Sequence, residues 1–213
     1  MSSLRFPAIS TLRRRAVLTA CIGAAVLLSA CGTGGGGWHH TDVSGNTPDL
    51  AFRLTRASDG RTVTERDYRG KVVLVYFGYT YCPDVCPLTL SNLAQALNRI
   101  DGAEDRVRVL FITVDPERDT RETLRQYTAN FGPEFAGLRG SDNALARVAK
   151  RYRVAYSADP APNPADYVVT HSSAVYAFDE KGEARLLLTG LSDGDADIDP
   201  VVADLKKLMA GQD

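Results

Sequence analysis

The fold is decided by one stretch in the middle of the chain, VVLVYFGYTYCPDVCP, residues 72–87. Its first part, Val72–Phe77, is an uninterrupted apolar run rich in β-branched residues, which is typical of a central strand covered on both faces. A helix is predicted next, because three leucines recur at the spacing of one helical face: Leu90, Leu93 and Leu97. Two cysteines, Cys82 and Cys86, therefore lie where a buried strand gives way to a helix.

Strands and helices are also expected on both sides of this stretch. The further strands expected are Leu50–Leu54, Thr62–Thr64, Val107–Val114, Ala174–Phe178 and Ala184–Thr189. Further helices are expected near residues 119–131, 142–152 and 201–208. This order predicts an α/β fold, a single thioredoxin-like domain over residues 48–213 with a central sheet flanked by helices.

Three local signals refine this picture. Pro87 has no amide proton, so we expect the regular helix to begin near Pro87, with the two cysteines in an irregular loop before it. Asp119 is expected to cap the next helix, with Glu122 completing a capping box. The proline-rich stretch Ser157–Asp166 is expected to be an inserted, exposed loop before the segment that carries His171.

The length and net charge of the chain limit which classes of protein it can belong to. A length of 213 residues favours one domain plus a targeting segment. The net charge of −1 argues against a nucleic-acid partner, because such proteins normally present a basic face.

Residues 1–30 have the pattern of a bacterial lipoprotein signal peptide. Arginines 13–15 precede the apolar run Ala16–Ala30, which is too short to span a bilayer comfortably. The run ends in Leu28-Ser29-Ala30-Cys31, which resembles a lipobox and predicts lipidation at Cys31. The alternative is an ordinary secretory leader with Cys31 unmodified, and the arginines leave twin-arginine export open as well.

These signals predict an extracytoplasmic protein of the bacterial cell envelope, lipid-anchored to a membrane. More than one acyl chain is needed for durable anchoring, and a lipoprotein provides that. Residues 31–47 are expected to be the lipidated cysteine and a flexible tether rich in glycine. His39 and His40 lie in this stretch; they either bind a metal weakly or have no role.

The cysteine count singles out one pair. Of four cysteines, Cys21 lies in the leader and Cys31 is the predicted lipidation site. Only Cys82 and Cys86 are left, in an oxidising compartment where unpaired cysteines are a liability. Proximity to a helix N-terminus favours the thiolate, which is both the nucleophile and the metal ligand. The alternative, a structural disulfide, closes too small a loop to stabilise the fold much.

His171 is the third candidate group. It is the only histidine in the predicted domain, and it precedes the strand Ala174–Phe178 at the position expected to face the thiols. The alternative is a loop histidine with an ordinary hydrogen bond. Two thiolates and one imidazole make a soft, three-coordinate site, which favours Cu(I) and also accommodates Cu(II). Structural zinc normally takes four protein ligands.

These residues together resemble the Sco/SenC family of membrane-tethered copper proteins, which assist assembly of the CuA centre of cytochrome c oxidase. The resemblance extends from Pro48 to about Leu191. It rests on four segments and three further residues: Asp67–Lys71, Tyr76–Thr80, Cys82–Pro87, Val114–Thr120, Tyr167, and His171 with Ser172. It implies copper ligands at Cys82, Cys86 and His171.

The resemblance also implies a function and its partners. We expect a copper metallochaperone that delivers copper to the CuA domain of oxidase subunit II and receives it from an upstream periplasmic donor. The alternative is a thiol–disulfide oxidoreductase that reduces the CuA cysteines of subunit II, with Cys82 and Cys86 as a redox-active pair and no need of His171.

Three residues depart from the family pattern. Tyr81 replaces a frequent His, Arg121 replaces a frequent Pro, and Thr170 replaces the Asp that commonly precedes the ligand histidine. Loss of that carboxylate puts metal affinity or redox tuning in question, because groups behind a ligand orient it. Acidic residues near the site either add charge there or cap turns: Asp84, Asp115 and Asp119.

Overall fold

The apolar run at residues 72–77 lies at the centre of an eight-stranded sheet with the order β1-β10-β9-β4-β5-β6-β2-β3. The structure, a computed structural model, describes residues 37–159, 162 and 167–212, so the predicted leader and Cys31 lie outside the described residues. Strand β4 (Val72–Gly78) is buried along its whole length. It pairs in parallel with β5 (Val107–Thr113) and antiparallel with β9 (Val175–Phe178), which confirms the predicted central strand.

The other strands of the main sheet are short. They are β1 (Thr41–Asp42), β2 (Arg53–Arg56), β3 (Thr62–Thr64), β6 (Phe135–Arg139) and β10 (Ala184–Leu188). The predicted β9–β10 hairpin is confirmed, whereas the strand expected at Leu50–Leu54 begins later, at Arg53. The sequence did not indicate β6, which pairs in parallel with β5.

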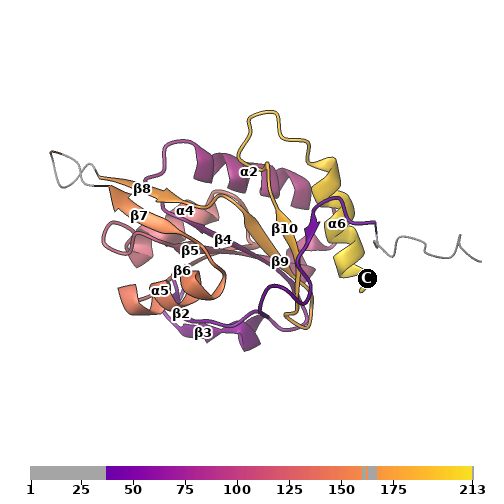
Figure 1. Cartoon of the computed structure of the whole chain (residues 1–213), viewed down its shortest axis with the longest axis horizontal. Coiled ribbons are helices and arrows are strands. Elements are labelled where there is room, and N and C mark those ends of the chain that lie inside the picture. Colours follow the sequence, from indigo (N-terminus) through magenta and orange to yellow (C-terminus); the bar gives the residue numbers. More distant parts are fainter. Residues whose placement is uncertain (1–36, 160–161, 163–166, 213) are drawn as a thin grey trace, which may run out of the picture. The chain divides into compact units, whose positions relative to one another are not determined.

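Helices flank the sheet, as the predicted mixed α/β fold requires. They are η2 (Glu65–Tyr68), α2 (Val85–Leu97), α3 (Ala103–Arg106), α4 (Arg121–Ala129), α5 (Asp142–Arg151) and α6 (Asp199–Met209). Helices α2 and α6 contact each other along one side of the sheet, and α5 lies on the other side (Figure 1). Within the described residues, no helix has the length and apolarity needed to cross a bilayer.

Two predicted helix starts are wrong. Helix α2 begins at Val85, so Cys86 lies in its first turn and Pro87 follows within the helix. This is tolerated because amides of the first turn have no partner inside a helix anyway. Helix α4 is capped by Thr120, whose Oγ1 accepts a hydrogen bond from the Thr123 amide at 3.1 Å. Asp119 is instead fully buried.

The stretch predicted as a loop contains part of a second, two-stranded sheet. Strand β7 (Tyr156–Asp159) pairs antiparallel with β8 (Val168–His171). The prediction of a loop from Ser157 is therefore wrong for the first residues of that stretch, and His171 is the last residue of β8 rather than a loop residue. Figure 1 shows this hairpin, hereafter the histidine hairpin, extending beyond one end of the main sheet.

The start of the folded unit also differs from the prediction. The unit begins at Trp38 rather than Pro48. Strand β1 pairs with β10, and the amides of His39 and His40 donate to the Asp204 carboxylate on α6. The His40 ring lies 2.8 Å from the same carboxylate. Residues 38–42 are therefore held to the domain, and the prediction of a flexible tether is wrong for them.

Candidate metal centre

The two thiols are positioned by the end of β4 and the start of α2. After β4 the chain turns back, and the Cys82 amide donates to the Tyr79 carbonyl at 3.3 Å. Cys86 lies in the first turn of α2, and its amide points at the Cys82 sulfur at 3.4 Å. Both cysteines are buried and neither forms a disulfide. The helix N-terminus and this amide supply positive partial charge to the Cys82 sulfur.

A glycine makes room for this arrangement. A Cβ at Gly78 would lie 2.9 Å from the Cys86 sulfur and 2.6 Å from a ring carbon of Phe111. Both distances are shorter than real Cβ contacts, so only glycine allows Cys86 to pack against the end of β4.

His171 completes the group. Its Nε2 lies 3.2 Å from the Cys86 sulfur, and its Nδ1 lies 2.9 Å from the Ser172 carbonyl oxygen. A carbonyl can only accept, so Nδ1 carries a proton and donates it to Ser172, which leaves Nε2 facing the thiols. The ligand atoms of Cys82, Cys86 and His171 all lie within 4.8 Å of one another.

The two sulfurs hold one proton unequally. The pKa of Cys82 is lowered far below that of a free thiol, first because Cys86 hydrogen-bonds to it and then through His171 and two backbone amides, which outweigh burial. The pKa of Cys86 is raised, because it donates to Cys82 and is buried. The pair is therefore a Cys82 thiolate beside a Cys86 thiol. A metal that binds both sulfurs has to displace only the proton of Cys86.

Tyrosines surround the group, a feature that the sequence pattern did not predict. The Tyr76 hydroxyl donates to the Cys86 sulfur at 3.6 Å, and the His171 ring packs edge-on against Tyr79 with centroids 5.9 Å apart. The signal for Tyr76 was available, since a hydroxyl inside an otherwise apolar buried strand needs a partner.

The three acidic residues that were expected near the site have different surroundings. Asp84 is exposed before α2 and makes no side-chain cap. Asp119 is buried and accepts hydrogen bonds from the Thr80 amide, the Thr80 hydroxyl (2.6 Å) and the Thr113 hydroxyl (2.6 Å). Burial raises its pKa against these hydrogen bonds. Asp119 therefore fixes the chain that leads into Cys82. Asp115 lies against Arg118 and Tyr167.

The three departures from the family pattern also have defined surroundings. Thr170 is exposed, and its hydroxyl donates to Asp159 across the histidine hairpin at 3.2 Å, away from the thiols. Tyr81 is 60% exposed beside Cys82, with the Arg118 guanidinium 5.1 Å from its ring centroid. Arg121 is the first residue of α4.

The donor set indicates which ions the group suits. Two thiol sulfurs and one imidazole nitrogen at these separations suit a soft ion of low coordination number. Among the described residues, no other His, Cys, Asp or Glu belongs to a candidate metal group, whereas a closed structural zinc site takes four protein ligands.

The fold and site define a class: a thioredoxin-like domain with a dithiol and a histidine converging at one end of its sheet. Comparison with known proteins gives the family. The family model described as SCO1/SenC matches residues 43–210, and the chain belongs to this family.

Individual relatives agree with this assignment. The mitochondrial SCO2 homologue of Bos taurus is 44% identical over 125 residues, and the mitochondrial SCO1 homologue of Homo sapiens is 40% identical over 134 residues. The matches cover 58% and 62% of this chain but 47% and 44% of these relatives, so the chain spans less than half of their length.

A solved structure is similar over three quarters of this chain. It is the copper-bound structure of Bradyrhizobium japonicum ScoI, with a TM-score of 0.67 and 35% sequence identity, and the match covers 75% of this chain and 98% of that one.

Proposed function

We propose that this chain is a copper metallochaperone that binds copper through Cys82, Cys86 and His171 and delivers it to the CuA centre of cytochrome c oxidase subunit II. The observation that carries the proposal is the convergence of the three ligand atoms within 4.8 Å of one another. Its support is membership of the SCO1/SenC family and similarity to a copper-bound ScoI.

The donor chemistry favours copper as cargo. Thiolates are soft ligands that select Cu(I), and the imidazole nitrogen also accommodates Cu(II). Cys82 already carries negative charge, so loading has to remove only the Cys86 proton. With only three protein ligands, an incoming thiolate from a partner can bind copper before the donor ligands leave.

The surroundings of the site suit a transient encounter with another protein. Among the described residues, three large apolar side chains are exposed, Tyr81, Val85 and Val168, and each lies on a segment that carries a ligand. Exposed apolar side chains around a site are typical of interaction surfaces. An upstream periplasmic copper donor and the CuA domain would use this end of the domain in turn.

We place the protein in the bacterial cell envelope, outside the cytoplasm and lipid-anchored through Cys31. The support is the leader pattern with its lipobox-like end. Replacing Cys31 by Ser would release the protein from membranes, as measured by fractionation, if the anchor is a lipid on this sulfur.

Copper titration against a Cu(I) chelator tests the binding part. The reduced protein should bind one Cu(I), and Cys82→Ala or Cys86→Ala should abolish tight binding. His171→Ala should weaken it, while the exposed His39→Ala serves as the matched histidine control and should bind as the wild type does. Equal affinity of the His171→Ala and His39→Ala variants would refute the third ligand.

A second candidate is reduction of the CuA cysteines of subunit II, and the thiolate–thiol asymmetry of Cys82 and Cys86 favours it. Such a pair can attack a disulfide through one sulfur and resolve the mixed disulfide with the other. The protein would be mixed with oxidised subunit II without copper. Reduction that His171→Ala leaves unchanged would support this activity, and its absence would leave metal transfer as the function.

A further inference from the structure

The histidine hairpin is not hydrogen-bonded into the main sheet. Strands β7 and β8 form a separate two-stranded sheet. A lone two-stranded hairpin is marginally stable in water, so its position depends on what anchors it to the domain. Among its described residues only Val169, between two exposed neighbours on β8, is buried, while Tyr156 and Tyr167 pack partly buried against the core. The distance from His171 to the thiols therefore depends on contacts made by the rest of the hairpin.

Tyr167, directly before β8, makes three such contacts. Its hydroxyl donates to the Asp115 carboxylate at 2.5 Å, and its carbonyl accepts from the Arg118 guanidinium at 2.9 Å. The guanidinium carbon also lies 3.7 Å from the Tyr167 ring centroid, which is a stacked cation–π contact. Backbone, ring and hydroxyl of one residue are thus all held by the loop between β5 and α4.

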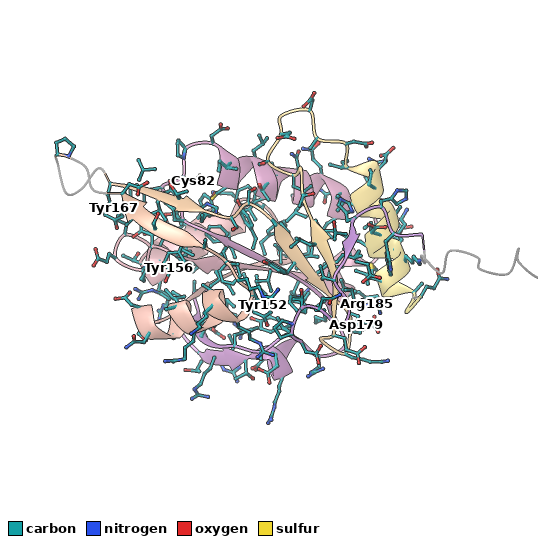
Figure 2. All side chains as sticks on the ribbon, in the orientation of Figure 1. Cys82, Tyr152, Tyr156, Tyr167, Asp179 and Arg185 are labelled. Atoms are coloured by element: carbon teal, nitrogen blue, oxygen red, sulfur yellow. The ribbon has the colours of Figure 1, made fainter. Side chains whose placement is uncertain are left out.

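The same guanidinium reaches the thiol side of the site. Arg118 forms an ion pair with Asp115 at 2.5 Å, and this carboxylate is almost completely buried. The guanidinium carbon lies 5.1 Å and 5.7 Å from the ring centroids of Tyr81 and Tyr79, which lead into Cys82. Figure 2 shows Tyr167 and Cys82 at the same end of the molecule. Arg118 therefore lies between the segment before Cys82 and the segment before His171.

We propose that Asp115, Arg118 and Tyr167 form a latch that holds the histidine hairpin against the thiols and thereby sets how long copper stays bound. Tyr167 lies at one end of β8 and His171 at the other. Releasing Tyr167 lets the strand move as a unit and carries Nε2 away from the sulfurs. The site then has two ligands instead of three, and copper leaves faster. These are positioning residues, and the role in copper residence rests on the function proposed above.

Two variants break the latch at different points. Tyr167→Phe removes the hydroxyl and keeps the ring under the guanidinium, and Arg118→Gln removes the ion pair and the stack. The matched controls lie elsewhere. Tyr176→Phe removes a hydroxyl that donates to the Tyr152 carbonyl at 2.7 Å, and Arg125→Gln removes an exposed ion pair with Glu122 on α4.

The first measurement uses the reduced, metal-free protein. Amide hydrogen exchange should be about tenfold faster across β8 in Tyr167→Phe and faster still in Arg118→Gln, since exchange reports local opening. The main-sheet strands and both control variants should exchange as the wild type does. If the β8 amides exchange at the wild-type rate in both latch variants, the proposal is overturned. This outcome does not depend on whether copper is the natural cargo.

The second measurement uses the Cu(I)-loaded protein. Release to a chelator should be about tenfold faster in Tyr167→Phe, one factor of ten being the worth of about 1.4 kcal/mol, and the copper–nitrogen contribution to X-ray absorption should fall. Adding Tyr167→Phe to His171→Ala should produce no further acceleration, because both act through the same ligand.

The possible outcomes show separately whether the latch proposal fails and whether the proposed copper function fails. Faster exchange with unchanged release, or additive effects of the two substitutions, overturns the proposal that the latch acts through His171. A wild-type protein that binds no copper refutes the proposed function, and the exchange result alone then decides whether the latch positions the hairpin.

Discussion

At the scale of single residues, Cys82 and Cys86 share one proton between their sulfurs. Cys86 keeps it because its thiol is buried and donates to Cys82, and Cys82 remains a thiolate supported by amides and by His171. His171 Nε2 faces the same space because Nδ1 donates its proton to the Ser172 carbonyl. A thiolate, a thiol and an imidazole are thus gathered at one place before any metal arrives.

The pH dependence of thiol alkylation tests this assignment. A lowered pKa means that the Cys82 thiolate persists as the pH falls below neutrality and is lost only at strongly acid pH. We expect Cys82 in the folded, metal-free protein to react with iodoacetamide at pH 6, whereas in urea its reactivity should appear only near the ordinary thiol pKa of about 8.5. Mass spectrometry locates the label. A folded-state profile that inflects near pH 8.5 contradicts the shared proton.

At the scale of elements, the junction between β4 and α2 determines where the thiols lie. Gly78→Ala places a methyl group against Phe111 and the Cys86 sulfur, so we expect a loss of about 1–3 kcal/mol in the free energy of unfolding and weaker copper binding. Gly194→Ala is the control, because nothing lies within 4 Å of a Cβ there. Urea denaturation and copper titration measure both effects. Equal behaviour of the two variants would mean that the junction is not tightly packed.

The histidine hairpin allows a test of the residue before the ligand. The family often has Asp where this chain has Thr170, but the Thr170 hydroxyl donates to Asp159 on the outer side of the hairpin. Thr170→Asp would put two carboxylates across the strand pair, which is destabilising. We therefore expect faster amide exchange in β8 and no gain in copper affinity, with Thr170→Asn as the uncharged control. A clear gain in affinity would show that the carboxylate acts on the metal site.

The sequence indicated elements where one physical signal dominated. Strand β4 is an apolar run without competing signals, and the leucines of α2 specify one face, so both were predictable. Strand β6 was missed because Phe135–Arg139 is short and contains a glycine, whose lack of a Cβ lets α4 approach. The prolines after Ser157 suggested only a loop, although residues up to Asp159 pair with β8.

The three candidate ligands could be predicted from the sequence, but the contacts that hold them in place could not. Cys82, Cys86 and His171 follow from cysteine counting and from the position of the only histidine in the predicted domain. The contacts of Asp119 with Thr80 and of Arg118 with Tyr167 join residues that are 39 and 49 positions apart in the sequence. No local pattern specifies such pairs, because they depend on how the finished sheet brings loops together. Asp119 was therefore interpreted as a helix cap.

At the scale of the whole molecule, the metal site and the start of the domain lie at opposite ends. Figure 1 shows β1 and α6 at one end and the histidine hairpin at the other. Trp38 packs against the Lys207 ammonium at 4.1 Å from its ring centroid, and Asp204 binds both histidine amides. If the proposed lipid anchor holds the protein through residues before Trp38, the end with the candidate metal site would remain accessible to partners.

Replacing the acceptor tests whether this attachment is part of the fold. Asp204 is almost completely buried, so Asp204→Ala leaves the His39 and His40 amides without their partner and should lower the free energy of unfolding by about 1–3 kcal/mol. Copper affinity should not change, since the site lies at the other end. Thermal unfolding and copper titration, with the exposed Asp195→Ala as control, measure the two properties. Loss of copper binding in Asp204→Ala would contradict the separation of the two ends.

The most direct test of the account is X-ray absorption at the copper edge of the reduced protein loaded with one equivalent of Cu(I). Convergence of Cys82, Cys86 and His171 predicts a single copper bonded to two sulfurs and one imidazole nitrogen, with the nitrogen contribution lost in His171→Ala. A spectrum with sulfur ligands alone, or one that His171→Ala leaves unchanged, would contradict it.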